Sequence, residues 1–167
     1  MSKFMQKFHF PRLTTKHLAF NAVIAALYFV LSYYLQPLSF GAIQFRVAEA
    51  MTILPLFNPY NIIGLTVGCL VTNLLSPFGA ADIVVGTLAT LIAGCLTYAC
   101  RKRPLVGAAF PVLVNAILLP FVWALSGAPE AYIVNFSTVL VSQAVIVYCL
   151  GIPLYHALKR TKLFREA

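Results

Sequence analysis

The sequence has few charged residues and very few acidic ones. Of its 167 residues, 10% are charged, with 4 Asp or Glu against 12 Lys or Arg. An average soluble domain is about half apolar and about a quarter charged, whereas this chain is 61% hydrophobic. So few charges cannot cover a globule of this size in water. The composition therefore excludes a soluble enzyme, a disordered tail and a nucleic-acid-binding module, and it indicates a membrane protein.

The sequence also lacks the motifs of nucleotide-binding and catalytic proteins. No G-x-x-x-x-G-K-[ST] loop is present, and neither H-E-x-x-H nor G-x-S-x-G occurs. The four cysteines lie in apolar stretches without a C-x-x-C pair, and the three histidines are too scattered for a metal site. We therefore expect no enzyme activity, no metal and no cofactor in this chain.

The apolar residues fall into six segments separated by charged or turn-forming residues. A helix needs about 20 mainly apolar residues to cross a bilayer core of about 30 Å. Five segments approach that length, whereas the segment 46–57 is short and carries Arg46 and Glu49. The segments expected to be helical are 17–35, 46–57, 60–76, 82–100, 105–125 and 132–157.

The basic residues predict which segments cross the membrane. They gather in residues 1–16, in the run 101–103 and in residues 159–167, and cytoplasmic loops carry an excess of Lys and Arg. All three clusters lie on the cytoplasmic side only if the short segment 46–57 also crosses. We therefore predict an all-α, six-helix transmembrane bundle, formed by residues 17–158, with both termini cytoplasmic.

This orientation gathers polar residues near the outer face. Ionisable groups in membrane segments are costly, so each is a candidate for a site. Arg46 and Glu49 are three residues apart and share a helical face. They form either a structural ion pair or part of a ligand site. We expect this charged beginning of the helix to lie at the outer surface. Asp82 is either a helix N-cap or a ligand group, and Asn73 should face it across one hairpin.

Two further kinds of residue allow a structural or a functional interpretation. Asn115 and Gln143 lie midway along the last two segments, where amides can join helices or reach the same site. Small residues at a spacing of four let helices approach closely. They occur as Ala22-x-x-x-Ala26 and as Gly64-x-x-x-Gly68, and either pair can pack within the bundle or dock another protein.

Three stretches resemble the signature of the QueT family. They are IQFRVAEAMTILP at 43–55, GLTVGCLVTNL at 64–74 and GAADIVVGTLAT at 79–90. These small six-span proteins are assigned to the uptake of queuosine precursors and look like substrate-binding S components of energy-coupling factor (ECF) transporters. The resemblance implies a transmembrane coupling subunit and two ATPase subunits as partners, which hydrolyse the ATP, and it makes Ala22-x-x-x-Ala26 the candidate docking face.

The resemblance also implies a ligand, a 7-deazaguanine in its 7-aminomethyl or 7-cyano form or queuine itself. Its guanine-like edge offers an N–H and an NH₂ side by side, which a carboxylate accepts as a pair. The acidic bias of the outer face favours an aminomethyl cation over the neutral nitrile. We expect Glu49 or Asp82 to accept this pair of donors, and Asn73 and Gln44 to recognise the remaining edge of the ligand. Phe45 can stack on the ring. Arg46 can donate to the ligand carbonyl or hold Glu49 in place.

Two other functions remain compatible with the residues. The first keeps the membrane bundle but makes it a stand-alone transporter for another vitamin-like solute. The second is a membrane assembly protein that binds no solute.

Overall fold

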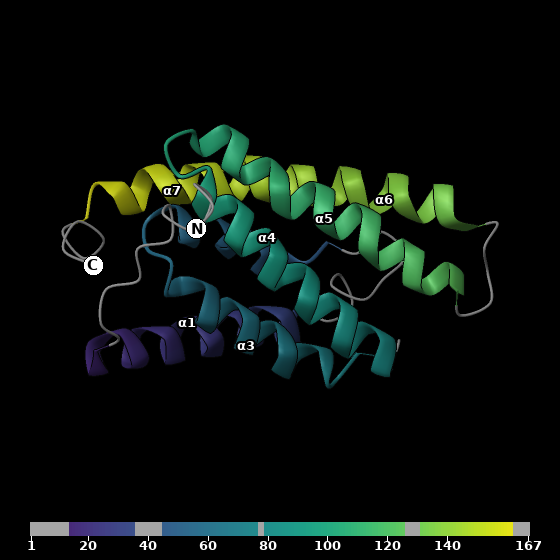
Figure 1. Ribbon diagram of the computed structural model, residues 1–167, viewed down its shortest axis with the longest axis horizontal. Coiled ribbons are helices and arrows are strands. Elements are labelled where there is room, and N and C mark those ends of the chain that lie inside the picture. Colours follow the sequence, from purple (N-terminus) through teal and green to yellow (C-terminus); the bar gives the residue numbers. More distant parts are fainter. Residues whose placement is uncertain (1–13, 36–44, 77–78, 126–130, 162–167) are drawn as a thin grey trace, which may run out of the picture.

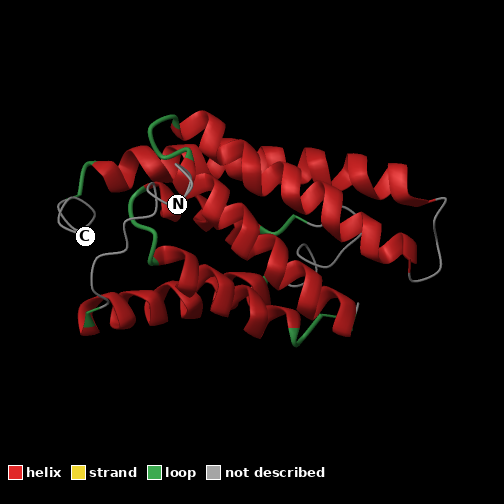
Figure 2. Ribbon diagram, viewed as in Figure 1, coloured by secondary structure: helices red, strands yellow, loops and turns green. Residues whose placement is uncertain are grey.

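The computed structural model describes residues 14–35, 45–76, 79–125 and 131–161, and these are helices joined by short turns, without a strand (Figure 1, Figure 2). Each segment expected to be helical is confirmed as a helix. Gln44 and most of the basic terminal residues lie outside the described ranges. In chain order the helices are α1 (Thr15–Tyr34), the 3₁₀ helix η2 (Val47–Leu56), α3 (Asn61–Asn73), the π-helix η3 (Asp82–Gly86), α4 (Thr87–Ala99), α5 (Pro104–Leu125), α6 (Tyr132–Val145), the π-helix η5 (Ile146–Gly151) and α7 (Ile152–Lys159).

The outer surface of the bundle is apolar. Large hydrophobic side chains face outward on several helices, including Val23 at 55%, Leu105 at 61% and Ile133 at 74% exposed. Four helical runs of the described chain are long and apolar enough to cross a membrane, and two apolar helices are shorter, η2 and α3. The long runs are Thr15–Tyr34, Asp82–Ala99, Pro104–Phe121 and Tyr132–Lys159. An apolar surface of this extent requires a lipid environment, so the chain is a multi-pass membrane protein.

The short helix η2 forms the core of the bundle. Every residue from Ala48 to Leu56 is buried, and η2 contacts α1, α3, α4, α5, η5 and α7. A 3₁₀ helix rises about 2.0 Å per residue against 1.5 Å in an α-helix, so these few residues reach farther. The helix ends before Asn58-Pro59 as predicted, and the Asn61 side chain donates to the Leu54 carbonyl at 2.9 Å across the break.

The charged beginning of η2 is buried within the bundle. Arg46 is 3% and Glu49 is 1% exposed, and the location of this end at the outer side of the membrane stays a prediction. Because other helices surround η2, its first residues face protein and not solvent. The two charges therefore need partners within the bundle.

Helices α1 and α3 lie side by side and approach closely through glycine (Figure 1). A Cβ atom at Gly64 would lie 2.7 Å from the Asn21 carbonyl oxygen, and one at Gly68 would lie 2.8 Å from the Tyr28 Cβ. The Gly64 amide also donates to Asn21 Oδ1 at 2.8 Å. Packing within the bundle is thus confirmed for the Gly64-x-x-x-Gly68 pair.

The alanine pair on α1 behaves differently. Ala22 and Ala26 are exposed, whereas the opposite face of α1 buries Asn21, Ile24 and Tyr28. Packing of this pair inside the described bundle is therefore wrong, because the face of α1 that carries the two alanines is exposed and points away from the other described helices.

The α1–α3 contact predicts a stability effect. Gly68→Val places side-chain atoms where Tyr28 and Ala25 already lie, and overpacking of this kind costs about 1–3 kcal/mol. We expect the thermal unfolding midpoint of the purified protein in detergent to fall by about 5 °C. The matched control is Val71→Leu, which adds volume at an exposed position of the same helix and should leave the midpoint unchanged. Equal midpoints for both variants would contradict the packing described.

Candidate functional site

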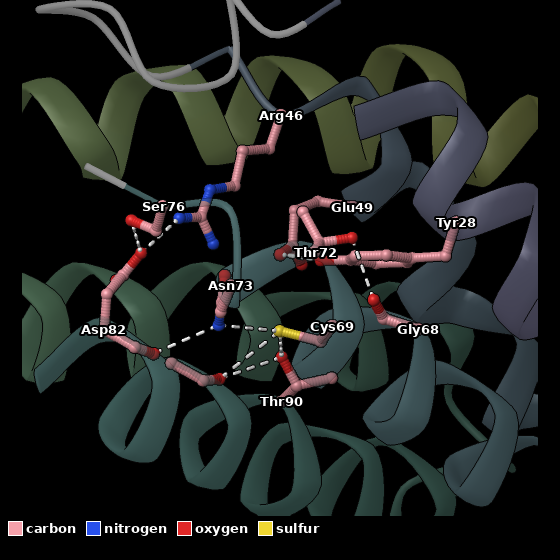
Figure 3. Close-up of polar contacts among 11 residues, drawn as sticks. Tyr28, Arg46, Glu49, Gly68, Cys69, Thr72, Asn73, Ser76, Asp82 and Thr90 are labelled. Atoms are coloured by element: carbon pink, nitrogen blue, oxygen red, sulfur yellow. Dashed lines mark hydrogen bonds and ion pairs between the residues drawn. The ribbon is translucent and has the colours of Figure 1, made fainter. Parts of the chain in front are cut away.

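A buried ion pair joins two distant parts of the chain (Figure 3). Arg46 directly precedes η2, and Asp82 is the first residue of η3. Arg46 Nη2 lies 3.1 Å from Asp82 Oδ2, and the two side chains are 3% and 0% exposed. The hydroxyl of Ser76, which follows α3, donates to the same Asp82 oxygen at 2.6 Å. Since both charges are buried, each depends on the other for compensation.

This pairing overturns two of the structural interpretations. The ion pair considered for Arg46 and Glu49 is wrong, because the guanidinium lies on Asp82. Arg46 precedes the helix with φ −80° and ψ 87°, so helical spacing does not align it with Glu49. The N-cap interpretation of Asp82 is wrong as well, because its amide already donates to the Gly79 carbonyl at 3.2 Å within a helical turn.

Glu49 has a different environment. The buried Tyr28 hydroxyl of α1 donates to Glu49 Oε1 at 2.7 Å. Thr52 Oγ1 donates to the Glu49 backbone carbonyl at 2.6 Å and stabilises the turn. The buried amide of Asn115, on α5, lies near the Glu49 carboxyl group. The hydrogen bond that orients the carboxylate therefore comes from a neutral group of α1.

Asn73 faces Asp82, as predicted, and the contact is a hydrogen bond to the backbone of Asp82. Its Nδ2 donates to the Asp82 carbonyl oxygen at 3.1 Å and lies 3.4 Å from Cys69 Sγ. Thr90 Oγ1 completes this network, at 3.1 Å from both Cys69 Sγ and the Gly86 carbonyl oxygen. A Cβ atom at Gly86 would lie 2.6 Å from Asn73 Nδ2. A side chain at this position would therefore displace the Asn73 amide from the π-helix, and π-helices are frequent at functional sites.

Four of the predicted site residues carry a buried acceptor oxygen that receives no hydrogen bond from the described part of the chain. A buried acceptor left unsatisfied costs about 1–3 kcal/mol, and each such group in a native structure calls for an explanation. Their side chains are at most 2% exposed. The atoms are Glu49 Oε2, Asn73 Oδ1, Asp82 Oδ1 and Gln143 Oε1. A ligand rich in hydrogen-bond donors would satisfy them.

The remaining predicted residues are placed as follows. Phe45 is half-buried beside Arg46, and Gln44 lies outside the described residues. Asn115 reaches the cluster through Glu49, whereas Gln143 is buried on α6.

The sequence analysis did not single out several residues that build the cluster. Tyr28, Cys69 and Thr90 are ordinary residues of apolar helices, and Ser76 is an ordinary turn residue. One signal was available, because Asn21, Tyr28 and Ser32 fall on one face of α1 at helical spacing, and that face is the buried one. A polar stripe on an apolar helix indicates contact with other polar groups.

Comparison with known proteins agrees with this picture of a membrane protein. The Queuosine precursor transporter QueT of Lactococcus lactis subsp. cremoris (strain MG1363) is 44% identical over 73 residues, which cover 42% of this chain and 43% of that protein. The matched part thus spans less than half the length of this curated relative. No solved structure matches the chain.

The family comparison covers more of the chain. The family model described as QueT transporter matches residues 18–160. This range contains α1 through α7 except the first three residues of α1, and it includes the whole polar cluster. A multi-pass bacterial membrane protein is consistent with both the helices and this match. The chain therefore belongs to the QueT transporter family.

Proposed function

We propose that this chain is the substrate-binding S component of an ECF-type importer for queuosine precursors. Membership of the QueT transporter family and the name of the Lactococcus relative support a role in uptake of such precursors. The sequence holds no nucleotide-binding loop, so ATP would be hydrolysed by two ATPase partners and coupled through a transmembrane subunit. The chain itself contributes the binding site and no cofactor.

The buried acceptor oxygens are the observation that carries the substrate proposal. A 7-deazaguanine presents donors along its edges, namely the ring N–H groups and the exocyclic amine. Glu49 Oε2, Asn73 Oδ1 and Asp82 Oδ1 all lack a donor in the described chain. Of the two carboxylates, Glu49 is the better acceptor, because Arg46 and Ser76 both donate to one oxygen of Asp82, whereas Glu49 Oε1 receives a single hydrogen bond from the neutral Tyr28 hydroxyl. Asn73 then recognises a second edge, and Phe45 and Gln44 complete the site.

The same proposal includes six membrane crossings with both termini in the cytoplasm. Four long helical runs and the two shorter helices supply the crossings. As a 3₁₀ helix of 10 residues, η2 rises about 20 Å, and the turns at its ends add the remaining depth. This arrangement puts residues 1–16, the run 101–103 and residues 159–167 on one side, as the positive-inside rule requires.

The partner proposal concerns α1. Ala22 and Ala26 are exposed on the face opposite Tyr28, and small residues allow another helix to approach closely in lipid. We assign this face to the transmembrane coupling subunit.

Two assays separate the proposal from the alternative functions. A stand-alone transporter would import substrate in a host without coupling ATPases, and an assembly protein would bind no deazapurine at all.

The substrate proposal predicts an effect of neutralising the carboxylates. Glu49→Gln and Asp82→Asn each remove a charged acceptor, and hydrogen bonds to charged groups contribute about 1.5–3 kcal/mol. We expect each variant to bind 7-aminomethyl-7-deazaguanine at least about tenfold more weakly, measured by calorimetric titration of the purified protein.

A matched control is available on α4. Thr97→Val removes a buried hydroxyl that donates to the Gly107 carbonyl, and it should leave the affinity unchanged. The site assignment is wrong if both carboxylate variants bind as tightly as the unmodified protein.

The partner proposal predicts a separation of binding from uptake. Ala22→Trp and Ala26→Trp fill the exposed face of α1, so they should abolish uptake by cells that contain the coupling module and leave the affinity of the purified chain unchanged. Ile133→Trp, at a position of α6 that is 74% exposed, is the control and should retain uptake. Normal uptake by both alanine variants would refute this docking face.

A further inference from the structure

The buried cluster contains one more negative than positive charge. Among the described residues, Arg46, Glu49 and Asp82 are the buried side chains of the Asp, Glu, Lys and Arg types. The other described basic residues are exposed or half-buried. With all three groups ionised, the cluster carries a net charge of −1. An uncompensated charge in the interior of a membrane protein is costly.

The structure distinguishes the two carboxylates by their partners. Asp82 is matched by the guanidinium of Arg46 at 3.1 Å. Glu49 receives a hydrogen bond from the neutral Tyr28 hydroxyl at 2.7 Å, and its other neighbours, Asn115 and Thr52, are also neutral. Among the described residues Arg46 is the buried basic side chain, and a single cation cannot neutralise two carboxylates.

The contact with Tyr28 orients Glu49 without cancelling its charge. A phenol donates a hydrogen bond to a carboxylate but remains neutral, and it occupies Oε1 while Oε2 receives no hydrogen bond from the described chain. A protein that needed only a structural carboxylate here would gain more from a basic partner, as at Asp82. The arrangement therefore leaves Glu49 Oε2 available to pair with a positive charge.

We propose that the site is built for a substrate with a single positive charge, and that Glu49 supplies its counter-charge. This inference rests on the proposed function and narrows its substrate class to 7-deazaguanines that carry a protonated amine. Tyr28 is then a positioning residue that fixes the direction of the Glu49 carboxylate. The Arg46–Asp82 pair is neutral as a whole and contributes shape and hydrogen bonding without adding to the net charge.

The test compares ligands that share one ring system and differ in charge. Purified full-length protein is titrated at pH 7 with 7-aminomethyl-7-deazaguanine, which is a cation, and with two neutral compounds, the 7-cyano form and the 7-hydroxymethyl analogue. The hydroxymethyl group matches the aminomethyl group in size and donates a hydrogen bond without a charge. We expect the cation to bind at least about tenfold more tightly than either neutral compound.

Two variants test whether charge is the cause of this preference. Glu49→Gln makes the cluster neutral and should bring the affinity ratio of cation to hydroxymethyl analogue close to one. The double variant R46Q/D82N removes both members of the ion pair and keeps the net charge at −1, so it should weaken both ligands and retain the ratio. The affinity ratio measured with the unmodified protein tests the inference even if neither variant folds.

The possible outcomes separate the inference from the proposed function. Equal binding of all three compounds by the unmodified protein would overturn the inference, because it would mean that a proton neutralises Glu49, and it would leave the proposed function standing. Preservation of the ratio in Glu49→Gln would also overturn it. Binding of none of the three compounds would contradict the proposed function itself.

Discussion

The buried ion pair between Arg46 and Asp82 is the interaction on which the rest of the polar cluster depends. Removing one partner of such a pair leaves an uncompensated buried charge and costs about 3–5 kcal/mol. The pair ties the beginning of η2 to the beginning of η3, and it thereby brings Glu49 and Asn73 into one region. Because Arg46 is committed to Asp82, the charge of Glu49 is left for another group.

The short helix η2 makes this arrangement possible. It is buried from Ala48 to Leu56 and contacts α1, α3, α4, α5, η5 and α7, so a charged residue near its beginning lies inside the bundle. Neighbouring helices then supply the hydroxyl of Tyr28 and the amide of Asn115. In our proposal α1 has two functions, since its inner face holds Glu49 and its outer alanine face meets the coupling subunit.

Hydropathy alone predicted each helix to within three residues at either end, because apolar length and turn residues determine where membrane helices start and stop. The sequence also identified Arg46, Glu49, Asn73 and Asp82, since charged residues are rare in its apolar segments and the amide Asn73 lies one hairpin from Asp82. Their pairing was not predictable. It joins residues 36 apart and depends on a non-helical residue before a 3₁₀ helix and on a π-helix, neither of which has a clear signature in one sequence. Tyr28 and Cys69 were missed because such residues are common in apolar helices.

An experimental structure of the purified chain with bound 7-aminomethyl-7-deazaguanine tests the central claim most directly. The account predicts that the ligand lies within hydrogen-bonding distance of Glu49 Oε2 and Asn73 Oδ1, with Tyr28 still donating to Glu49 and with Arg46 still paired to Asp82. A ligand bound elsewhere in the bundle, or one that contacts Asp82 in place of Arg46, would contradict it.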